Sequence, residues 1–194
     1  MPTDLRDTVL RSAVDHIAAH GPDSLSLREV ARAAGVSHQA PYHHFTDRAG
    51  IFEAIAGEGF ALLEAQLLTA LTETDTDRCT ALLEGYVCFA LDHRGHFRVM
   101  FQPDLCPDEL DPEVAAAGDR AFGVLIDFVR DSLGPDAGVD EIRARATAMW
   151  SMAHGLATLL IDGPLEKQLG QVTDRRRFIR AVAAQTGLTT RSEP

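Results

Sequence analysis

The chain has 194 residues, of which 45% are hydrophobic and 6% aromatic, and its formal net charge is −11. This size suits one compact domain, or a small domain joined to a larger one. Ala and Leu are abundant, and no run alternates in polarity as a strand rich in Val, Ile and Thr does, so we predict an all-α fold. The acidic balance by itself argues against a protein coated in nucleic acid, but overall charge is a poor guide when only one small element contacts phosphate.

The cysteines and the N-terminus bear on where the protein works. Cys79, Cys88 and Cys106 are odd in number and form no CxxC motif, which favours thiols in a reducing compartment. The N-terminal residues are polar and charged, so we expect no signal peptide. We find no apolar run of membrane-spanning length, and we therefore expect a cytoplasmic protein with no membrane partner.

Several helices are predicted in the N-terminal part of the chain. Apolar residues at every fourth position predict an amphipathic first helix. Ser26 and Glu29 fit a capping box at the start of the second helix, and Ser37 fits the cap of a short third helix. Thr46 or Asp47 can cap a longer fourth helix. The predicted helices cover residues 4–20, 27–34, 38–44 and 48–71.

The second and third predicted helices have the spacing of a helix-turn-helix motif. About three residues centred on Gly35 join them, and glycine adopts a positive φ without a Cβ clash. The small Ala31 lets the third helix approach the second. Val36 and Phe45 are expected to fix the third helix to the bundle, so we predict a compact three-helix domain here.

Beyond residue 71 the sequence changes to longer apolar helices, which are separated by breaks that contain Pro and Gly. We predict that the chain is organised as a helix-turn-helix domain over 1–47, a larger helical domain over 48–188, and a disordered tail over 189–194. The predicted helices of the larger domain lie near residues 77–93, 95–101, 111–133, 139–162 and 174–186.

The stretch GVSHQAPYHHF, residues 35–45, concentrates hydrogen-bond donors and acceptors and allows three interpretations: a metal site, an active site or a nucleic-acid surface. His16 and His20 have the spacing of a zinc pair, but the glutamate of a zinc-protease helix is absent. Ser37 does not lie in a Gly-x-Ser-x-Gly motif, and no strand precedes it. We therefore predict no metal, no cofactor and no enzymatic activity.

The remaining interpretation is contact with DNA. On a short helix, Gln39 can pair with adenine, while Tyr42 and the histidines can donate to phosphate oxygens. The amides at the N-termini of the second and fourth helices add favourable dipole ends. The predicted DNA-binding residues are Ser26, Leu27, Arg28, Ser37, His38, Gln39, Pro41, Tyr42, His43, His44 and Arg48.

The local charge is a difficulty for this interpretation. Residues 1–55 hold five arginines against seven acidic residues, with five histidines in addition. Affinity for DNA would therefore depend on the placement of side chains, on protonation of histidine near phosphate, and on two copies that act together.

The segment SLREVARAAGVSHQAPYHHFTDRAGIFEAI, residues 26–55, resembles the DNA-binding signature of TetR-family transcriptional regulators. The resemblance implies an all-helical repressor that binds double-stranded operator DNA as a homodimer and releases it when a small molecule binds the C-terminal domain. Many members carry lysine where this chain has Arg48, so the charge is kept there. The stretch MWSMAHGLATLLIDGPL, residues 149–165, is similar to the Trp-x-x-x-His-Gly region of one subgroup, which supports a shared dimerisation and ligand domain.

The larger domain contains candidates for effector binding and for dimerisation. A cavity lined by aromatic and sulfur-containing side chains would suit an apolar ligand, although most such residues are simply core. His154 is either a polar contact in that cavity or a core histidine. The helices near 139–162 and 174–186 are the candidate dimer interface. Small residues on 139–162 (Thr147, Ala148, Ser151, Gly155, Ala157, Thr158) would let two helices approach there, with Leu156, Leu159 and Leu160 as apolar area. The candidate effector residues are Phe89, Phe97, Met100, Phe101, Phe122, Trp150 and His154.

The other interpretation is a helical protein that binds a small ligand or another protein and does not read DNA. Binding to DNA that depends on sequence and salt separates the two.

Overall fold

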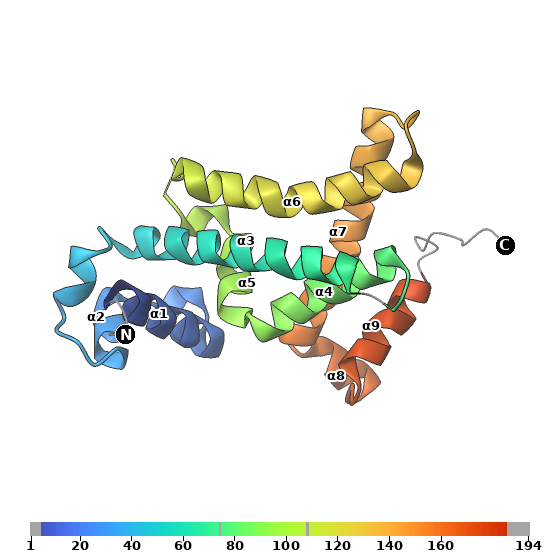
Figure 1. Ribbon diagram of the computed structural model, residues 1–194. Helices are drawn as coiled ribbons and strands as arrows, with labels where there is room; N and C mark the ends of the chain where they lie inside the picture. Colours follow the sequence, from blue (N-terminus) through green and yellow to red (C-terminus); the bar gives the residue numbers. More distant parts are fainter. Residues whose placement is uncertain (1–4, 74, 108, 186–194) are drawn as a thin grey trace. The chain divides into compact units, whose positions relative to one another are not determined.

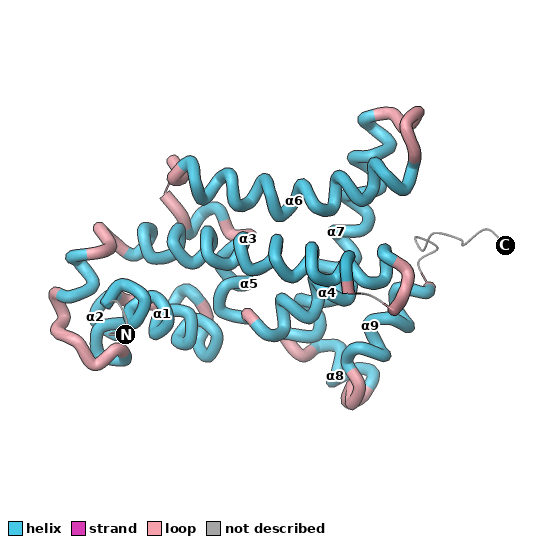
Figure 2. Tube along the Cα trace, viewed as in Figure 1, coloured by secondary structure: helices cyan, strands magenta, loops and turns pink. Residues whose placement is uncertain are grey.

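A computed structural model describes residues 5–73, 75–107 and 109–185. All regular structure in these residues is helical, and no strand occurs among them (Figure 2), so the predicted all-α fold is confirmed. The packing divides the chain into two units. Unit 1 comprises the residues up to 61 together with 93–118, and unit 2 comprises 62–92 together with the residues from 119 onward.

Unit 1 contains the N-terminal helices, joined by short 3-10 segments (Figure 1). The first helix ends where Gly21 takes a positive φ of 83°. The Asp47 carboxylate accepts a hydrogen bond from Gly50 N at 2.9 Å, as a cap of the fourth predicted helix would. The elements are α1 (Leu5–His20), η1 (Pro22–Ser24), α2 (Leu27–Ala33), η2 (Ala40–His43), the first part of α3 (Arg48–Thr72), α5 (Arg94–Met100), η3 (Pro103–Leu105) and the first part of α6 (Pro112–Leu133).

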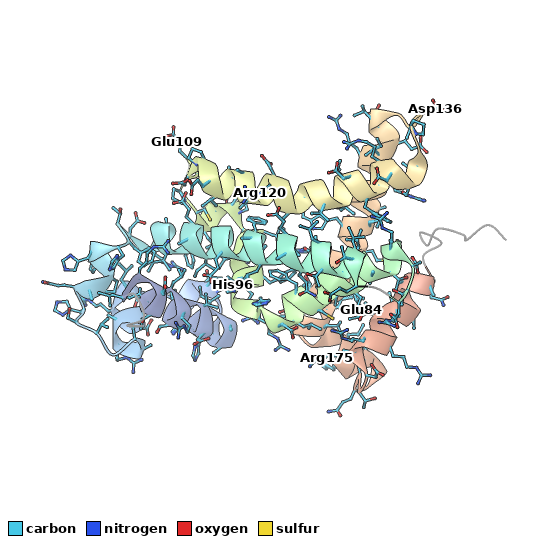
Figure 3. The ribbon with its side chains drawn as sticks, in the orientation of Figure 1. Glu84, His96, Glu109, Arg120, Asp136 and Arg175 are labelled. Carbon is cyan, nitrogen blue, oxygen red and sulfur yellow. The ribbon has the colours of Figure 1, made fainter. Side chains whose placement is uncertain are left out.

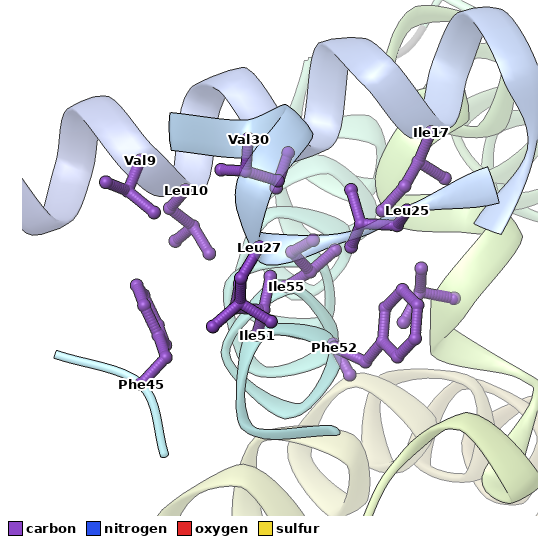
Figure 4. Packing of buried hydrophobic residues seen from close by; sticks show 13 residues of the cluster. Val9, Leu10, Ile17, Leu25, Leu27, Val30, Phe45, Ile51, Phe52 and Ile55 are labelled. Carbon is purple, nitrogen blue, oxygen red and sulfur yellow. The ribbon is translucent and has the colours of Figure 1, made fainter. Parts of the chain in front are cut away.

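An apolar core joins α1, α2 and α3 within unit 1 (Figure 4). Val9 and Ile17 of α1 are fully buried, as are Val30 of α2 and Ile51 of α3. Phe45, which follows η2, is 4% exposed and belongs to the same cluster. Because burial of one such side chain contributes about 1.5–3 kcal/mol, this core fixes both ends of the polar stretch.

Helix α5 is held against α1 by a close backbone approach and by a cap. A Cβ atom at Gly95 would overlap the carbonyl oxygen of Val14, so a larger residue does not fit without a shift. Arg98 Nη1 donates to the carbonyl oxygens of Ile17 and Ala18, both at 3.3 Å. These carbonyls belong to the last turn of α1, where the helix itself no longer provides a backbone N–H group for every carbonyl. A helix far along the chain thereby becomes part of unit 1.

Unit 2 is organised around α4, whose residues from Cys79 to Leu91 are almost all buried. This helix packs against α7 and against α9 (Figure 1). Gly85 lets α4 come close to α3, because a Cβ atom there would lie 3.0 Å from the Ala70 Cβ. Unit 2 consists of the second part of α3, α4 (Arg78–Asp92), the second part of α6, α7 (Val139–Ile161), α8 (Pro164–Leu169) and α9 (Arg175–Ala184).

The helix boundaries agree with the sequence patterns to within a few residues, apart from two elements. The short helix predicted over 38–44 is present as the 3-10 segment η2, which is limited to Ala40–His43. The patterns do not predict α8, whose six residues are too few to show a period. The predicted tail over 189–194 lies outside the described residues.

Helix α3 is long and apolar enough, by composition alone, to cross a membrane. Its most apolar 18-residue window has a mean hydropathy of 1.3, so the expectation that no run reaches this length is wrong. Within unit 1, however, α3 supplies Ile51, Phe52 and Ile55 to the core. A core helix of a soluble protein passes the same test, so hydropathy does not make α3 a membrane segment.

Candidate nucleic-acid interface

Local hydrogen bonds fix the turn between α2 and η2. The Ser26 Oγ accepts from Glu29 N at 3.3 Å and donates to the Glu29 carboxylate at 3.1 Å, which confirms the predicted cap of α2. Gly35 has a φ of +69°, in the left-handed region that favours glycine. Val36 N donates to Ala31 O at 3.0 Å and closes the turn. The helix-turn-helix layout is thereby confirmed.

The polar stretch forms a 3-10 segment because of its proline. Backbone bonds join Ala40 N to Ser37 O and Tyr42 N to Gln39 O, at 3.0 and 3.1 Å. Pro41 has no N–H to donate to Ser37 O, and in an α-helix its ring would clash with that carbonyl. A 3-10 segment, with bonds between residues three apart, avoids both problems.

The predicted DNA-contacting residues separate into exposed and buried groups. Tyr42 is 55% exposed and Arg28 is also exposed. Pro41 is fully buried, which corrects its place among the predicted DNA-binding residues, because with Ala40 it forms the inner side of η2. The Leu27 side chain is 8% exposed, so only its backbone amide is left for the predicted contact. We use the term recognition edge for the exposed residues Ser37, His38, Gln39, Tyr42, His43 and His44.

Two arginines of unit 1 form contacts that the sequence patterns do not predict. Arg48 Nη2 donates to Pro22 O at 2.6 Å, and its guanidinium lies 4.9 Å from the centre of the Phe52 ring. These contacts tie the start of α3 to η1 and restrict the reach of Arg48 toward phosphate. The exposed Arg6, which the sequence patterns do not single out, stacks over Phe45 at 5.6 Å from the ring centre. No local signal connects two residues so far apart in the chain.

The residues predicted to line an effector cavity fall in both units. In unit 1, the rings of Phe97 and Phe101 meet edge to face at 5.6 Å, and Phe101 meets Phe60 in the same way at 5.8 Å. A Cβ atom at Gly59 would lie 2.5 Å from the Met100 Sδ. This part of unit 1 is therefore closely packed.

In unit 2 the structure brings Phe122, Trp150 and His154 together and adds Tyr86, which the sequence patterns do not identify. Trp150 Nε1 donates to the Tyr86 Oη at 3.2 Å, and this oxygen lies 2.9 Å from His154 Nδ1. The Phe122 ring meets Trp150 edge to face at 5.3 Å. Phe89 is 2% exposed on α4. We call Tyr86, Phe122, Trp150 and His154 the aromatic network.

Burial governs the charge of the aromatic network. It raises the pKa of Tyr86 well above the ordinary value, although the hydrogen bond from Trp150 opposes this shift. Burial also lowers the pKa of His154. Both side chains are therefore uncharged at neutral pH, and the network offers aromatic faces and neutral hydrogen-bonding groups rather than charge.

Two of the grooves on unit 2 are lined by described residues other than the predicted effector residues. The larger, of about 380 Å³, lies between α3, α4 and α6. It contains Leu68 and Phe128, with Arg78 stacked 5.6 Å from the centre of the Phe128 ring. The smaller, of about 170 Å³, lies between α3, α4 and α9 and includes Cys88.

Glu84 of α4 is a buried carboxylate with partners on α9 (Figure 3); its side chain is 8% exposed. Arg180 Nε donates to one of its oxygens at 2.5 Å, and Arg176 Nη1 lies 3.3 Å from the other. Arg180 also pairs with Asp75 at 3.5 Å. A buried carboxylate without such partners is costly, so α9 and α4 are linked electrostatically. The sequence gives no sign of this contact, which joins residues 96 positions apart.

His96 of α5 is a buried histidine in unit 1 (Figure 3) and is 7% exposed. Its Nε2 lies 3.6 Å from the Glu58 carboxylate, and neither ring nitrogen forms a hydrogen bond within the described structure. Burial lowers the pKa of His96, the Glu58 carboxylate opposes the shift, and the neighbouring His93 adds to it.

Comparisons with known proteins agree with both parts of this description. The family model for bacterial regulatory proteins of the tetR family matches residues 9–55. The family model described as tetracyclin repressor-like, C-terminal domain matches residues 79–185, which is more than half of the chain. The chain belongs to the TetR family of bacterial regulatory proteins. TetR-family regulators bind operator DNA and small-molecule effectors, usually as dimers.

The chain is similar to one transcriptional activator and to one transcriptional repressor. The HTH-type transcriptional activator FasR of Mycolicibacterium smegmatis is 28% identical over 159 residues, which cover 81% of this chain and 69% of that protein. The HTH-type transcriptional repressor AcnR of Corynebacterium glutamicum is 37% identical over 60 residues, which cover 31% of this chain and 32% of that protein.

Two solved structures share the fold. A protein of unknown function from Rhodococcus sp. RHA1 is 31% identical, with a TM-score of 0.75 over 96% of this chain and 94% of that one. The TetR-family regulator PfmR from Thermus thermophilus is 21% identical, with a TM-score of 0.67 over 96% of this chain and 99% of that one.

The face of α7 predicted for dimerisation of this TetR-family regulator is exposed in part. A Cβ atom at Gly155 would meet no atom within 4 Å, and Leu159 is 43% exposed. Leu156, Ala157 and Leu160 are 6, 0 and 9% exposed. These three pack inside the chain, which corrects the prediction that they contribute to an interface. The exposed residues of this face are Thr147, Ala148, Ser151 and Leu159.

Proposed function

We propose that this TetR-family regulator binds a palindromic operator as a homodimer through the recognition edge, and that a small, largely apolar effector releases it. The observation that carries the proposal is the exposure of His38, Gln39 and Tyr42 on a helix-turn-helix frame whose apolar core is complete beneath them. Side chains that a rigid frame already holds outward lose less freedom on binding.

Each part of the edge has a role that its chemistry supports. The amide of Gln39 suits adenine in the major groove, and the hydroxyl of Tyr42 suits a phosphate oxygen. Ser26, Leu27 and Arg28 at the start of α2 provide amides and one cation beside the DNA backbone. We assign this role to residues 1–47, and effector binding and dimerisation to residues 48–188.

A homodimer would supply the second recognition edge. The small exposed residues of α7 let a second copy approach closely, and α9 is the other helix that we assign to the interface. The two edges would then meet half-sites about one DNA turn apart, or somewhat more. Such a protein acts in the cytoplasm.

The aromatic network supports the choice of an apolar effector. Its rings and neutral hydrogen-bonding groups suit a ligand with a large apolar part and a single polar group. An effector that binds one conformation better than the other shifts the dimer toward it, and release follows when the two edges no longer match successive grooves.

Repression is the direction of control that we propose, since an effector that removes a bound dimer frees the promoter. Activation is a second candidate, which the similarity to the activator FasR over 81% of this chain favours. Transcription in vitro, with the purified protein and its operator at a promoter, separates the two by the sign of the change.

The test of DNA binding is fluorescence anisotropy with DNA from upstream of the coding gene and a scrambled control. We expect binding that depends on sequence and weakens with salt. Gln39→Ala should weaken it by about 1–3 kcal/mol without a change in melting temperature or dimerisation. Weak binding that ignores sequence would instead support a helical ligand-binding protein that does not read DNA.

A further inference from the structure

The recognition edge has no permanent positive charge. Between Arg32 and Arg48 the chain contains no arginine or lysine, and its residues that can become cationic are His38, His43 and His44. All three histidines are exposed, in a segment whose backbone is fixed by η2. The side chains of this edge that can bring a positive charge to phosphate are therefore histidines, the residue type that can gain a proton near neutral pH.

The elements packed against η2 carry charged groups of both signs. On α1, the guanidinium of Arg6 lies over Phe45, and the acidic Asp7 follows it. After η2, the Asp47 carboxylate accepts a hydrogen bond from Gly50 N, and the Arg48 guanidinium donates one to the backbone carbonyl of Pro22. On α2, the charged residues are Arg28, Glu29 and Arg32.

We propose that this protein takes up protons on His38, His43 and His44 when it binds DNA, so that operator binding tightens as the pH falls. The proposal rests on the proposed function and specifies its regulation. The protonated imidazole is favoured when a phosphate oxygen lies beside it, because an opposite charge within a few ångström stabilises the charged form. The bound state therefore holds more protons than the free state, and acidification favours it.

Two quantities follow from this linkage. For each proton taken up, the association constant rises roughly tenfold per unit fall in pH within the titration range. Each new cation also neutralises one more phosphate, so the slope of log K against log salt steepens by about 0.9 per contact. A dimer carries two edges, which doubles both effects.

The experiment measures anisotropy of the full-length dimer on its operator at several salt concentrations, from about pH 6 to pH 8, across the range in which histidine titrates. We expect affinity at least tenfold higher at the acidic end, with a steeper salt dependence. Calorimetry in buffers of different ionisation enthalpy counts the protons directly, and we expect net uptake by the wild type.

Variants assign the effect to the edge. His38→Gln, His43→Gln and His44→Gln, alone and together, should reduce the pH dependence, whereas His43→Arg should keep binding strong at the alkaline end. His16→Gln is the matched control, because His16 lies on α1 and bonds to the Ser24 Oγ at 3.0 Å, and it should leave the pH dependence unchanged.

The outcomes are distinguishable. Sequence-specific binding with no proton uptake, or with a pH dependence that survives the triple variant, would overturn this proposal and leave the proposed function intact. Absence of specific binding at every pH would overturn the proposed function itself. Circular dichroism at each pH checks that the fold is the same throughout.

Discussion

The chain has two tyrosines, and they show how its two regions differ. Tyr42, at the recognition edge of unit 1, is 55% exposed. Tyr86, in unit 2, is 6% exposed, and its hydroxyl is bonded to Trp150 and His154. The same side chain therefore serves an outward surface in one region and an internal network in the other.

This difference extends to the other polar groups. The edge of unit 1 places its polar side chains in solvent above an apolar core, so a change there should alter binding and leave stability nearly intact. Unit 2 places polar groups inside, in the aromatic network and around Glu84. A change there removes hydrogen-bond partners from buried atoms and should alter stability first.

The largest expected effect is on the core beneath the edge. Phe52→Ala should lower the free energy of unfolding by about 3–5 kcal/mol, because it opens a cavity among fully buried side chains. Urea denaturation followed by circular dichroism measures this. Gln39→Ala, on the exposed edge of the same unit, is the control and should stay within about 0.5 kcal/mol. A small loss for Phe52→Ala would contradict its place in the core.

The two tyrosines offer a direct comparison of the regions. Tyr86→Phe leaves the Trp150 N–H and His154 Nδ1 without the hydroxyl, and should cost about 1–3 kcal/mol of stability. Tyr42→Phe should change stability by less than about 0.5 kcal/mol and should weaken operator binding. Thermal melts and anisotropy on both variants measure this. Equal loss of stability in the two would show that the regions do not differ as described.

Two open glycines test the α7 face. Gly123 on α6 and Gly155 on α7 both leave room for a Cβ atom. Gly123→Ala should stabilise its helix by about 0.5–1 kcal/mol and leave the dimer unchanged. Gly155→Ala should weaken the dimer in sedimentation equilibrium, because the methyl group would separate two close helices. An unchanged dimer would place the interface elsewhere.

The smallest expected effect is on how steeply the free energy of unfolding changes with pH. Burial lowers the pKa of His96 and of His154 below the ordinary histidine value of about 6.5. The unfolded chain then binds these protons more readily, so their contribution to stability is present above that value and is lost as the pH falls below it. His96→Leu should flatten the dependence of unfolding free energy on pH. A dependence as steep as in the wild type would assign it to other groups.

The sequence by itself determined most of the fold of unit 1. The cap at Ser26, the positive φ at Gly35 and the outward direction of Gln39 and Tyr42 all follow from residues within about four positions, where backbone hydrogen bonds and steric limits act. Pro41 shows the limit even of local reasoning, because the patterns placed it among the DNA-binding residues, whereas it is buried in the 3-10 segment η2.

Only the tertiary structure decided the polar contacts of unit 2. Glu84 pairs with Arg176 and Arg180 of α9, and Tyr86 pairs with Trp150 and His154 of α7. The partners in each pair lie on different helices and are at least 64 positions apart in the chain. It also decided that Leu156 and Leu160 face inward. Such contacts depend on how helices pack, and neither the period of a helix nor its caps specifies which partner will lie across the interface.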